Sequence, residues 1–137
     1  MEIRVYYEDT DCGGVVYHSN YLKYMERSRT ELLRSIGLNL AHYHTIGLLW
    51  AITEVNIKYR YPARYDDLLT LKTKIIDVSS YRVEFKSEVF NQNGVLCAHG
   101  DIKMVGFYAE TGKVARFPDE ILCILEANCT GGKNDAK

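Results

Sequence analysis

The segment from Tyr6 to Tyr21, YYEDTDCGGVVYHSNY, carries residue types that could do chemistry. It contains an adjacent glycine pair, one histidine (His18) and three acids, which are Glu8, Asp9 and Asp11. A carboxylate held beside a reacting acyl group can act as a general base or as a nucleophile. Adjacent glycines let the backbone come close to a substrate, because they carry no side chain. The segment is therefore a candidate site for acyl-group chemistry.

The other half of such a site would be a helix that begins just after His18. Ser19 and Asn20 are both suited to cap it, because a short side-chain oxygen can accept from a free amide. The first amides of a helix have no partner within it, and the helix dipole is positive there. Such donors can stabilise a developing oxyanion. Acids and histidines also precede helices for structural reasons, so the pattern alone leaves both roles open.

Apolar residues at helical spacing predict a long helix over residues 20–36, and Gly37 stands where a helix-ending glycine belongs. Alternating apolar residues then predict strands, separated by turns such as the hairpin signal Asn93-Gly94. The predicted strands are residues 3–7, 53–61, 71–75, 81–89 and 98–107, and the remaining elements are a helical turn and loop at 38–47 and a helix at 119–126.

Strands that follow one another through hairpins are antiparallel. The pattern therefore predicts an α+β fold in which an antiparallel β-sheet wraps around the single long helix. No repeat or linker interrupts it, so we expect one domain over residues 1–129. Residues 130–137 are polar and glycine-rich and are expected to form a disordered tail.

Length and composition suit one soluble globular domain. The chain has 137 residues, of which 47% are hydrophobic, and a formal net charge of -1. A nucleic-acid binder usually shows a basic excess, so none is indicated. The longest apolar stretch, Ile46–Ile52, is too short to cross a bilayer, and the N-terminus lacks the apolar core of a signal peptide. The four cysteines have no metal-ligand spacing, so we expect reduced thiols in the cytoplasm.

A longer stretch, RVYYEDTDCGGVVYHSNYLKYMERSRTELLR from Arg4 to Arg34, resembles the signature of hotdog-fold acyl-CoA thioesterases. The resemblance is to the 4-hydroxybenzoyl-CoA thioesterase family, and more closely to its YbgC type, which is associated with the Tol-Pal system. Weaker similarity continues through VNIKYRYPARYDD, residues 55–67, and on to about Glu126. Cys12 departs from the pattern, since many relatives have Ala or Pro there.

The resemblance implies a hotdog fold and the hydrolysis of an acyl-CoA to a free acid and CoA. The family's catalytic carboxylate corresponds to Asp11, as general base or nucleophile, and its oxyanion donor corresponds to the backbone amide of His18. The family uses no cofactor or metal. Its members form homodimers, usually paired into homotetramers, with active sites at the subunit interface. Acyl carrier protein is an alternative thiol carrier, and a peripheral position at the inner membrane is an alternative to free cytoplasm.

Three residues beside the motif are further candidates for substrate contacts, namely Tyr7, Gly14 and Asn20. Tyr7 could equally pack in the core, and Asn20 could be a helix cap instead. CoA carries phosphates, which bind basic side chains. The basic candidates lie around Pro62 and are Lys58, Arg60 and Arg64, although each could equally be a solvated charge at a strand end.

Two other functions stay open. A hotdog dehydratase acting on a β-hydroxyacyl thioester would need a histidine and an acid arranged for proton transfer at carbon. The position of Asp11 ahead of the glycine pair favours hydrolysis instead. A non-catalytic module that binds acyl-CoA or acyl carrier protein in phospholipid or envelope metabolism would release no thiol from any thioester.

Overall fold

The long helix predicted from the sequence is α1, Asn20–Ser35, in the computed structural model, which describes residues 1–130. One face of α1 is buried, and its buried residues are Tyr21, Tyr24, Met25, Ser28, Arg29 and Leu33. Gly37 follows the helix with φ +96°, a left-handed conformation that glycine adopts without strain. The amide of Leu38 donates to the carbonyl of Leu33 and that of Gly37 to Arg34, so a Schellman motif ends the helix as predicted.

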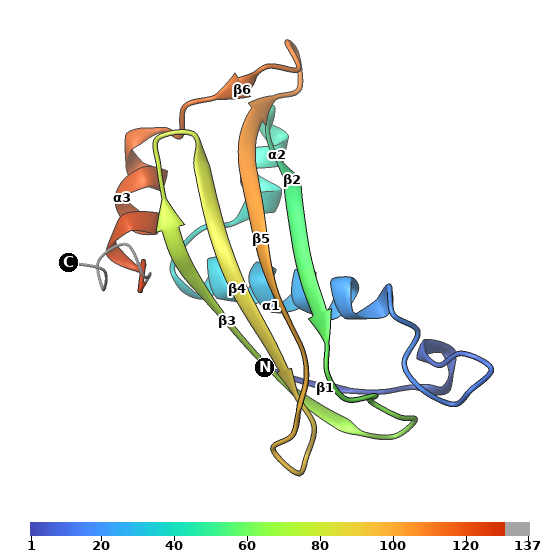
Figure 1. The fold of residues 1–137 in the computed structure, drawn as a ribbon. Coiled ribbons are helices and arrows are strands. Elements are labelled where there is room, and N and C mark those ends of the chain that lie inside the picture. Colours follow the sequence, from blue (N-terminus) through green and yellow to red (C-terminus); the bar gives the residue numbers. More distant parts are fainter. Residues whose placement is uncertain (131–137) are drawn as a thin grey trace.

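The sheet against which α1 packs is antiparallel, with the strand order β1-β3-β4-β5-β2. Its strands are β1 (Glu2–Arg4), β2 (Leu48–Tyr59), β3 (Leu68–Val78), β4 (Arg82–Phe90) and β5 (Leu96–Tyr108), and a short β6 (Val114–Ala115) pairs with β5. Figure 1 shows the strands curving past α1, which crosses one face of the sheet and contacts β3 and β4. The predicted α+β architecture, an antiparallel sheet around one long helix, is confirmed.

Two shorter helices complete the fold over the described residues. Helix α2, Leu40–Thr45, falls within the predicted helical turn, and the side chain of Asn39 caps it by accepting from the amides of Ala41 and His42. Helix α3, Asp119–Ala127, confirms the predicted C-terminal helix and packs against β3 (Figure 1). The amide of Thr130 donates to the carbonyl of Ile75 at 2.9 Å, so Thr130 is hydrogen-bonded to the sheet. The rest of the predicted tail, residues 131–137, lies outside the described residues.

Several predicted strand boundaries were wrong. Strand β3, Leu68–Val78, extends three residues beyond each end of the predicted 71–75, and two other differences bear on the site. Strand β1 ends at Arg4 instead of continuing through Tyr7, because the carboxylate of Asp9 accepts from the amide of Tyr6 and a 3-10 helix, η1 (Tyr7–Asp9), begins there. Strand β2 begins at Leu48, five residues before the predicted start, in a continuous apolar run that lacks the alternation of a half-buried strand.

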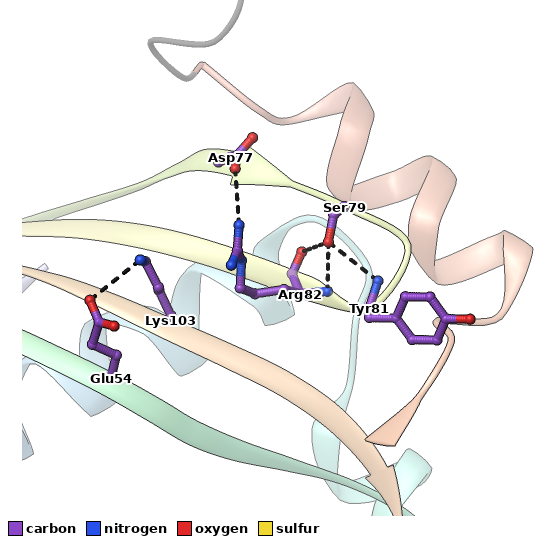
Figure 2. Close-up of polar contacts among 6 residues, drawn as sticks. All are labelled: Glu54, Asp77, Ser79, Tyr81, Arg82 and Lys103. Carbon is purple, nitrogen blue, oxygen red and sulfur yellow. Dashed lines mark hydrogen bonds and ion pairs between the residues drawn. The ribbon is translucent and has the colours of Figure 1, made fainter. Parts of the chain in front are cut away.

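The outer face of the sheet carries polar contacts between neighbouring strands (Figure 2). Lys103 of β5 pairs with Glu54 of β2 at 3.3 Å, and Ser79 accepts from the amide of Arg82 at 3.1 Å in the turn between β3 and β4. Exposed ion pairs of this kind contribute about 0–1 kcal/mol. The stability of the fold therefore rests mainly on the apolar side of the sheet and on α1.

Candidate active site

The segment between β1 and α1, residues 5–19, is fixed to the rest of the fold at its start. The amide of Val5 donates to the carbonyl of Asp67, and the amide of Asp66 donates to the carbonyl of Val5, both at 2.9 Å. In Figure 1 this segment loops out beyond the N-terminal end of α1, near the end of β2. Backbone hydrogen bonds therefore fix the start of this segment to the residues just before β3.

Asp9 fastens the middle of this segment. Its carbonyl accepts from the amide of Tyr17 at 2.9 Å and from the side-chain amide of Asn20 at 2.8 Å, so it joins the loop to the first residue of α1. The hydroxyl of Tyr24 is buried nearby, and burial, followed by the Asp9 carboxylate, raises the pKa of Tyr24. The contacts that hold this part of the loop are therefore those of the Asp9 carbonyl with Tyr17 and Asn20.

Asp11 lies at the start of a tight turn formed by residues 11–15. Its amide donates to the carbonyl of Val15, and Gly14, at φ +79°, donates its amide back to the carbonyl of Asp11. One carboxylate oxygen, Oδ1, accepts from the amide of Gly13 at 2.8 Å. A Cβ at position 13 would lie 3.3 Å from that oxygen, which is tighter than most such contacts. The carboxylate of Asp11 is thus oriented by the backbone, and the residue is solvent-exposed.

Asp11 and His18 line one pocket of about 320 Å³. Its other lining residues are Val15, Val16, Tyr21, Tyr59, Arg60, Tyr61 and Pro62. They come from the loop, from the first turn of α1 and from the end of β2 with the residues after it. The structure therefore brings together the two residues that the resemblance marked as catalytic, although they are seven positions apart in the chain.

His18 is held by its carbonyl and its ring. The hydroxyl of Tyr59 donates to the carbonyl oxygen of His18 at 3.1 Å, and the imidazole packs against the rings of Tyr17 and Tyr59 with centroid separations of 4.5 and 6.3 Å. Within residues 1–130, the amide of His18 donates to no other group. The site therefore offers an amide without a hydrogen-bond partner two residues ahead of α1, in a residue that lines the same pocket as Asp11.

The other predicted site residues separate into two groups. Arg60 lines the pocket, and its Nε donates to Nε2 of His99 at 3.2 Å. The residues outside the pocket lining are Tyr7, Gly14, Asn20, Lys58 and Arg64. Gly14 shapes the turn that carries Asp11, and Lys58 lies opposite His99 in the β2–β5 register.

Both structural alternatives given for Tyr7 and Asn20 proved wrong. Tyr7 is 78% exposed and contacts the ring of Tyr65, so it does not pack in the core. Asn20 is the first residue of α1 and not its cap, and the side chain of Ser19, at the capping position, makes no capping hydrogen bond. The amide group of Asn20 instead donates to Asp9, which ties the loop to the helix.

The aromatic side chains that line the pocket, among them Tyr21 and Tyr59, were not predicted from the sequence. Tyr21 is buried and its hydroxyl oxygen accepts from the amide of Ala63 at 3.2 Å, and its ring meets that of Tyr59 edge-on at 5.4 Å. Burial raises the pKa of Tyr21. The signal available in the sequence was only that Tyr59 and Tyr61 share one face of a strand. The sequence did not indicate that this face meets the start of α1, because that contact depends on how β2 packs in the fold.

Within residues 1–130, no group of three or more histidine, cysteine and acidic side chains is arranged to hold a metal ion. In the same part of the chain, every helix is too short or too polar to cross a membrane.

Comparison with known proteins identifies the family. The model of the Thioesterase-like superfamily matches residues 5–125. The acyl-CoA thioesterase YbgC of Haemophilus influenzae is 34% identical over 122 residues, which are 87% of this chain and 88% of that protein. The acyl-CoA thioester hydrolase YbgC of Escherichia coli O6:H1 is 34% identical over 103 residues, 75% and 77% of the two chains.

Solved structures agree with these matches. The DHNA-CoA thioesterase from Staphylococcus aureus superimposes with a TM-score of 0.88 and 29% identity, and the alignment covers 100% of this chain and 93% of that one. The resemblance to YbgC-type proteins drawn from the Arg4–Arg34 motif is thus confirmed. The chain belongs to the Thioesterase-like superfamily and has the hotdog fold.

Proposed function

We propose that this protein hydrolyses an acyl-CoA thioester to a free acid and CoA in the pocket that Asp11 and His18 line. The observation that carries the proposal is that two residues line one pocket: Asp11, whose carboxylate accepts from the amide of Gly13, and His18, whose backbone amide has no hydrogen-bond partner within residues 1–130. The similarity to YbgC acyl-CoA thioesterases supports the same reaction.

The two groups have complementary roles. The thioester carbonyl oxygen accepts from the amide of His18, which stabilises the oxyanion of the tetrahedral intermediate. Asp11 either removes a proton from the attacking water or attacks the carbonyl carbon itself to form a mixed anhydride that water then hydrolyses. Both routes break the carbon–sulfur bond and release CoA as a thiol. The imidazole of His18, packed against Tyr59, is a further candidate base or substrate contact.

The direct test is the release of free CoA from a panel of acyl-CoA esters, from short to long chains and including benzoyl-CoA. We expect thiol release, and the panel defines the acyl preference. A dehydratase would convert a β-hydroxyacyl-CoA to the enoyl ester without releasing thiol. A binding module would retain the esters unchanged, and either result with folded protein would overturn the proposal.

Arg60→Ala is expected to raise KM for acyl-CoA about 3- to 10-fold with little change in kcat, because an exposed charge-assisted contact to a CoA phosphate is worth about 1 kcal/mol. Arg60 lines the pocket and Arg64 does not, so Arg64→Ala is the matched control and should change KM less. Steady-state kinetics at low and high salt measure both, and the Arg60 effect should shrink as salt screens the phosphate. An unchanged KM in Arg60→Ala at low salt would remove Arg60 from the CoA contact.

Acyl carrier protein is the alternative carrier of the thioester. It would present the same phosphopantetheine arm but an acidic protein surface in place of the nucleotide. Comparing hydrolysis of one acyl group on CoA and on acyl carrier protein distinguishes the two. We propose the cytoplasm as the location of the protein, because an acyl-CoA substrate is intracellular, and its four free cysteines are in keeping with a compartment where thiols stay reduced.

We also propose a homodimer or a homotetramer, supported by strand β2. It lies at the edge of the sheet, and over residues 1–130 its outer edge pairs with no strand. Ile52, Val55 and Tyr59 on this strand are exposed apolar residues. An unpaired edge of this length is a template for pairing with a second chain. Light scattering should give a mass two or four times the 15.7 kDa of one chain, and a mass of 15.7 kDa would contradict the proposal.

A further inference from the structure

Tyr59, the last residue of strand β2, contacts the residue that carries the proposed oxyanion donor. Its hydroxyl donates to the carbonyl oxygen of His18 at 3.1 Å, and within residues 1–130 no other group donates to that carbonyl. The two residues are 41 positions apart in the chain. The contact therefore joins the end of β2 to the start of α1 at the pocket that both residues line (Figure 1).

His18 lies inside a turn formed by residues 17–20. The amide of Asn20 donates to the carbonyl of Tyr17 at 2.9 Å, which closes the turn. The Tyr17 carbonyl belongs to the same peptide group as the amide of His18. Because that group is planar and trans, its C=O and its N–H point in opposite directions. The hydrogen bond of the turn therefore sets the direction of the His18 amide from one side of the residue.

The next peptide group, between His18 and Ser19, is spanned by the hydrogen bond of the turn but is not held by it. Tyr59 holds this group, since the carbonyl that accepts from its hydroxyl belongs to it. With a peptide group held on each side, both backbone dihedral angles of His18 are constrained. Loss of the Tyr59 hydroxyl would release one of the two groups, and the His18 amide would then be less firmly directed.

Tyr59 is itself held by the sheet and by its ring. It pairs with Ala98 in the β2–β5 register, and the amide of the next residue, Arg60, donates to the carbonyl of Cys97 at 2.8 Å. Its ring meets that of Tyr21 edge-on at 5.4 Å, and Tyr21 is buried. A hydroxyl on a ring fixed in this way can hold a backbone group in place. Because Tyr59 is 47% exposed, water competes for the same contact, so its effect is moderate.

From these contacts we infer that Tyr59 is a positioning residue for the hydrolysis proposed above, on which this role rests. It acts through His18: its hydroxyl fixes the backbone of His18, so that the His18 amide points at the carbonyl oxygen of the bound thioester. A donor stabilises an oxyanion only when it is aimed at the place where the charge develops, and it acts best when it is already in position. Tyr59 therefore affects kcat and leaves KM unchanged.

Tyr59→Phe removes the hydroxyl and keeps the ring against Tyr21. We expect kcat for acyl-CoA hydrolysis to fall about 3- to 10-fold with KM unchanged, an effect of the size that one neutral hydrogen bond produces. Tyr61→Phe is the matched control, because Tyr61 lines the same pocket and is 50% exposed, and its hydroxyl makes no hydrogen bond within residues 1–130. Wild-type kcat in Tyr59→Phe would overturn the inference, as would an equal loss in Tyr61→Phe or a loss that follows a changed mass in light scattering.

Double variants show whether Tyr59 acts through the backbone of His18. His18→Ala keeps the amide, so Tyr59→Phe should lower kcat by the same factor in that background as in the wild type. His18→Pro removes the amide hydrogen, so adding Tyr59→Phe to it should lower kcat by less than about 2-fold further. Losses that multiply in the His18→Pro background would overturn the inference. So would the disappearance of the Tyr59→Phe effect in His18→Ala, because it would assign the contact to the imidazole.

A measurement without turnover tests the contact itself. In isotopically labelled protein, the nuclear magnetic resonance shift of the His18 carbonyl carbon should change in Tyr59→Phe and stay in Tyr61→Phe, because only the first variant removes its hydrogen-bond donor. An unchanged His18 shift in Tyr59→Phe would overturn the inference even if His18→Pro does not fold. A wild type that releases no thiol from any ester would overturn the proposed hydrolysis, whereas unchanged kcat in Tyr59→Phe beside an active wild type would overturn the role of Tyr59 alone.

Discussion

Asp11→Asn lowers kcat for acyl-CoA hydrolysis by about 10²- to 10⁴-fold, the loss expected when a general base or nucleophile is removed. Asparagine is the sharpest replacement here, because its side-chain oxygen can still accept from the amide of Gly13 and keep the turn in place. The change therefore removes basicity and negative charge but not the local geometry. KM should move little, since the carboxylate acts on the reacting atoms and not on the CoA moiety.

Glu8→Gln is the matched control for Asp11→Asn. Glu8 is an exposed acid three residues away in η1 and lies outside the pocket, so its loss removes one charge without touching the site. Both variants are assayed for thiol release at saturating substrate, with circular dichroism to verify folding. Near-wild-type turnover in Asp11→Asn would disprove the role of Asp11, whatever the result for Glu8→Gln.

The parts of the site that the sequence predicts are those made by short-range structure. Asp11 and His18 belong to one loop whose turn and helix junction are built from hydrogen bonds between residues close in the chain. Local residue types, including the glycine pair and the acids, are sufficient to indicate such a loop. The helix and most strands were predictable for the same reason, because their periodicity is a local property.

Local pattern failed where two local preferences competed. The alternation of Ile3 and Val5 suggested that a strand would reach Tyr7, but the side chain of Asp9 captures the amide of Tyr6 and turns the chain. Aspartate often competes with secondary structure in this way. The consequence for the site is large, since Tyr7 ends up exposed instead of beside the pocket.

The remaining pocket residues depend on tertiary neighbours. Tyr59 and Arg60 reach the loop only because β2 pairs with β5 and runs alongside α1 toward its first turn. Arg64 is as close to Pro62 in sequence as Arg60 is, and Lys58 is only two residues further, yet Lys58 and Arg64 lie outside the pocket lining. Spacing in the chain could not separate these cations. The burial of Arg29 on α1 could likewise not be predicted from the pattern, because an arginine on a helix is usually solvated.

Removing the amide hydrogen of residue 18 should lower kcat by about 10²- to 10³-fold, the loss typical for one oxyanion donor. His18→Pro removes that hydrogen along with the imidazole, whereas His18→Ala removes the imidazole alone. Since this amide donates to no described residue, proline breaks no internal hydrogen bond there. We therefore expect a much smaller loss in His18→Ala than in His18→Pro, with both melting near the wild-type temperature.

The comparison separates backbone from side chain because both variants lack the imidazole and only the proline variant lacks the amide hydrogen. Equal and large losses in both would assign the effect to the imidazole, which Tyr17 and Tyr59 contact, and would make it the base or substrate contact. If proline disturbs the loop, an ester in place of the Tyr17–His18 peptide bond removes the same hydrogen without restricting φ. Full activity of a folded ester variant would show that the oxyanion is held by another group, and the amide of His18 would then lose its role while that of Asp11 stands.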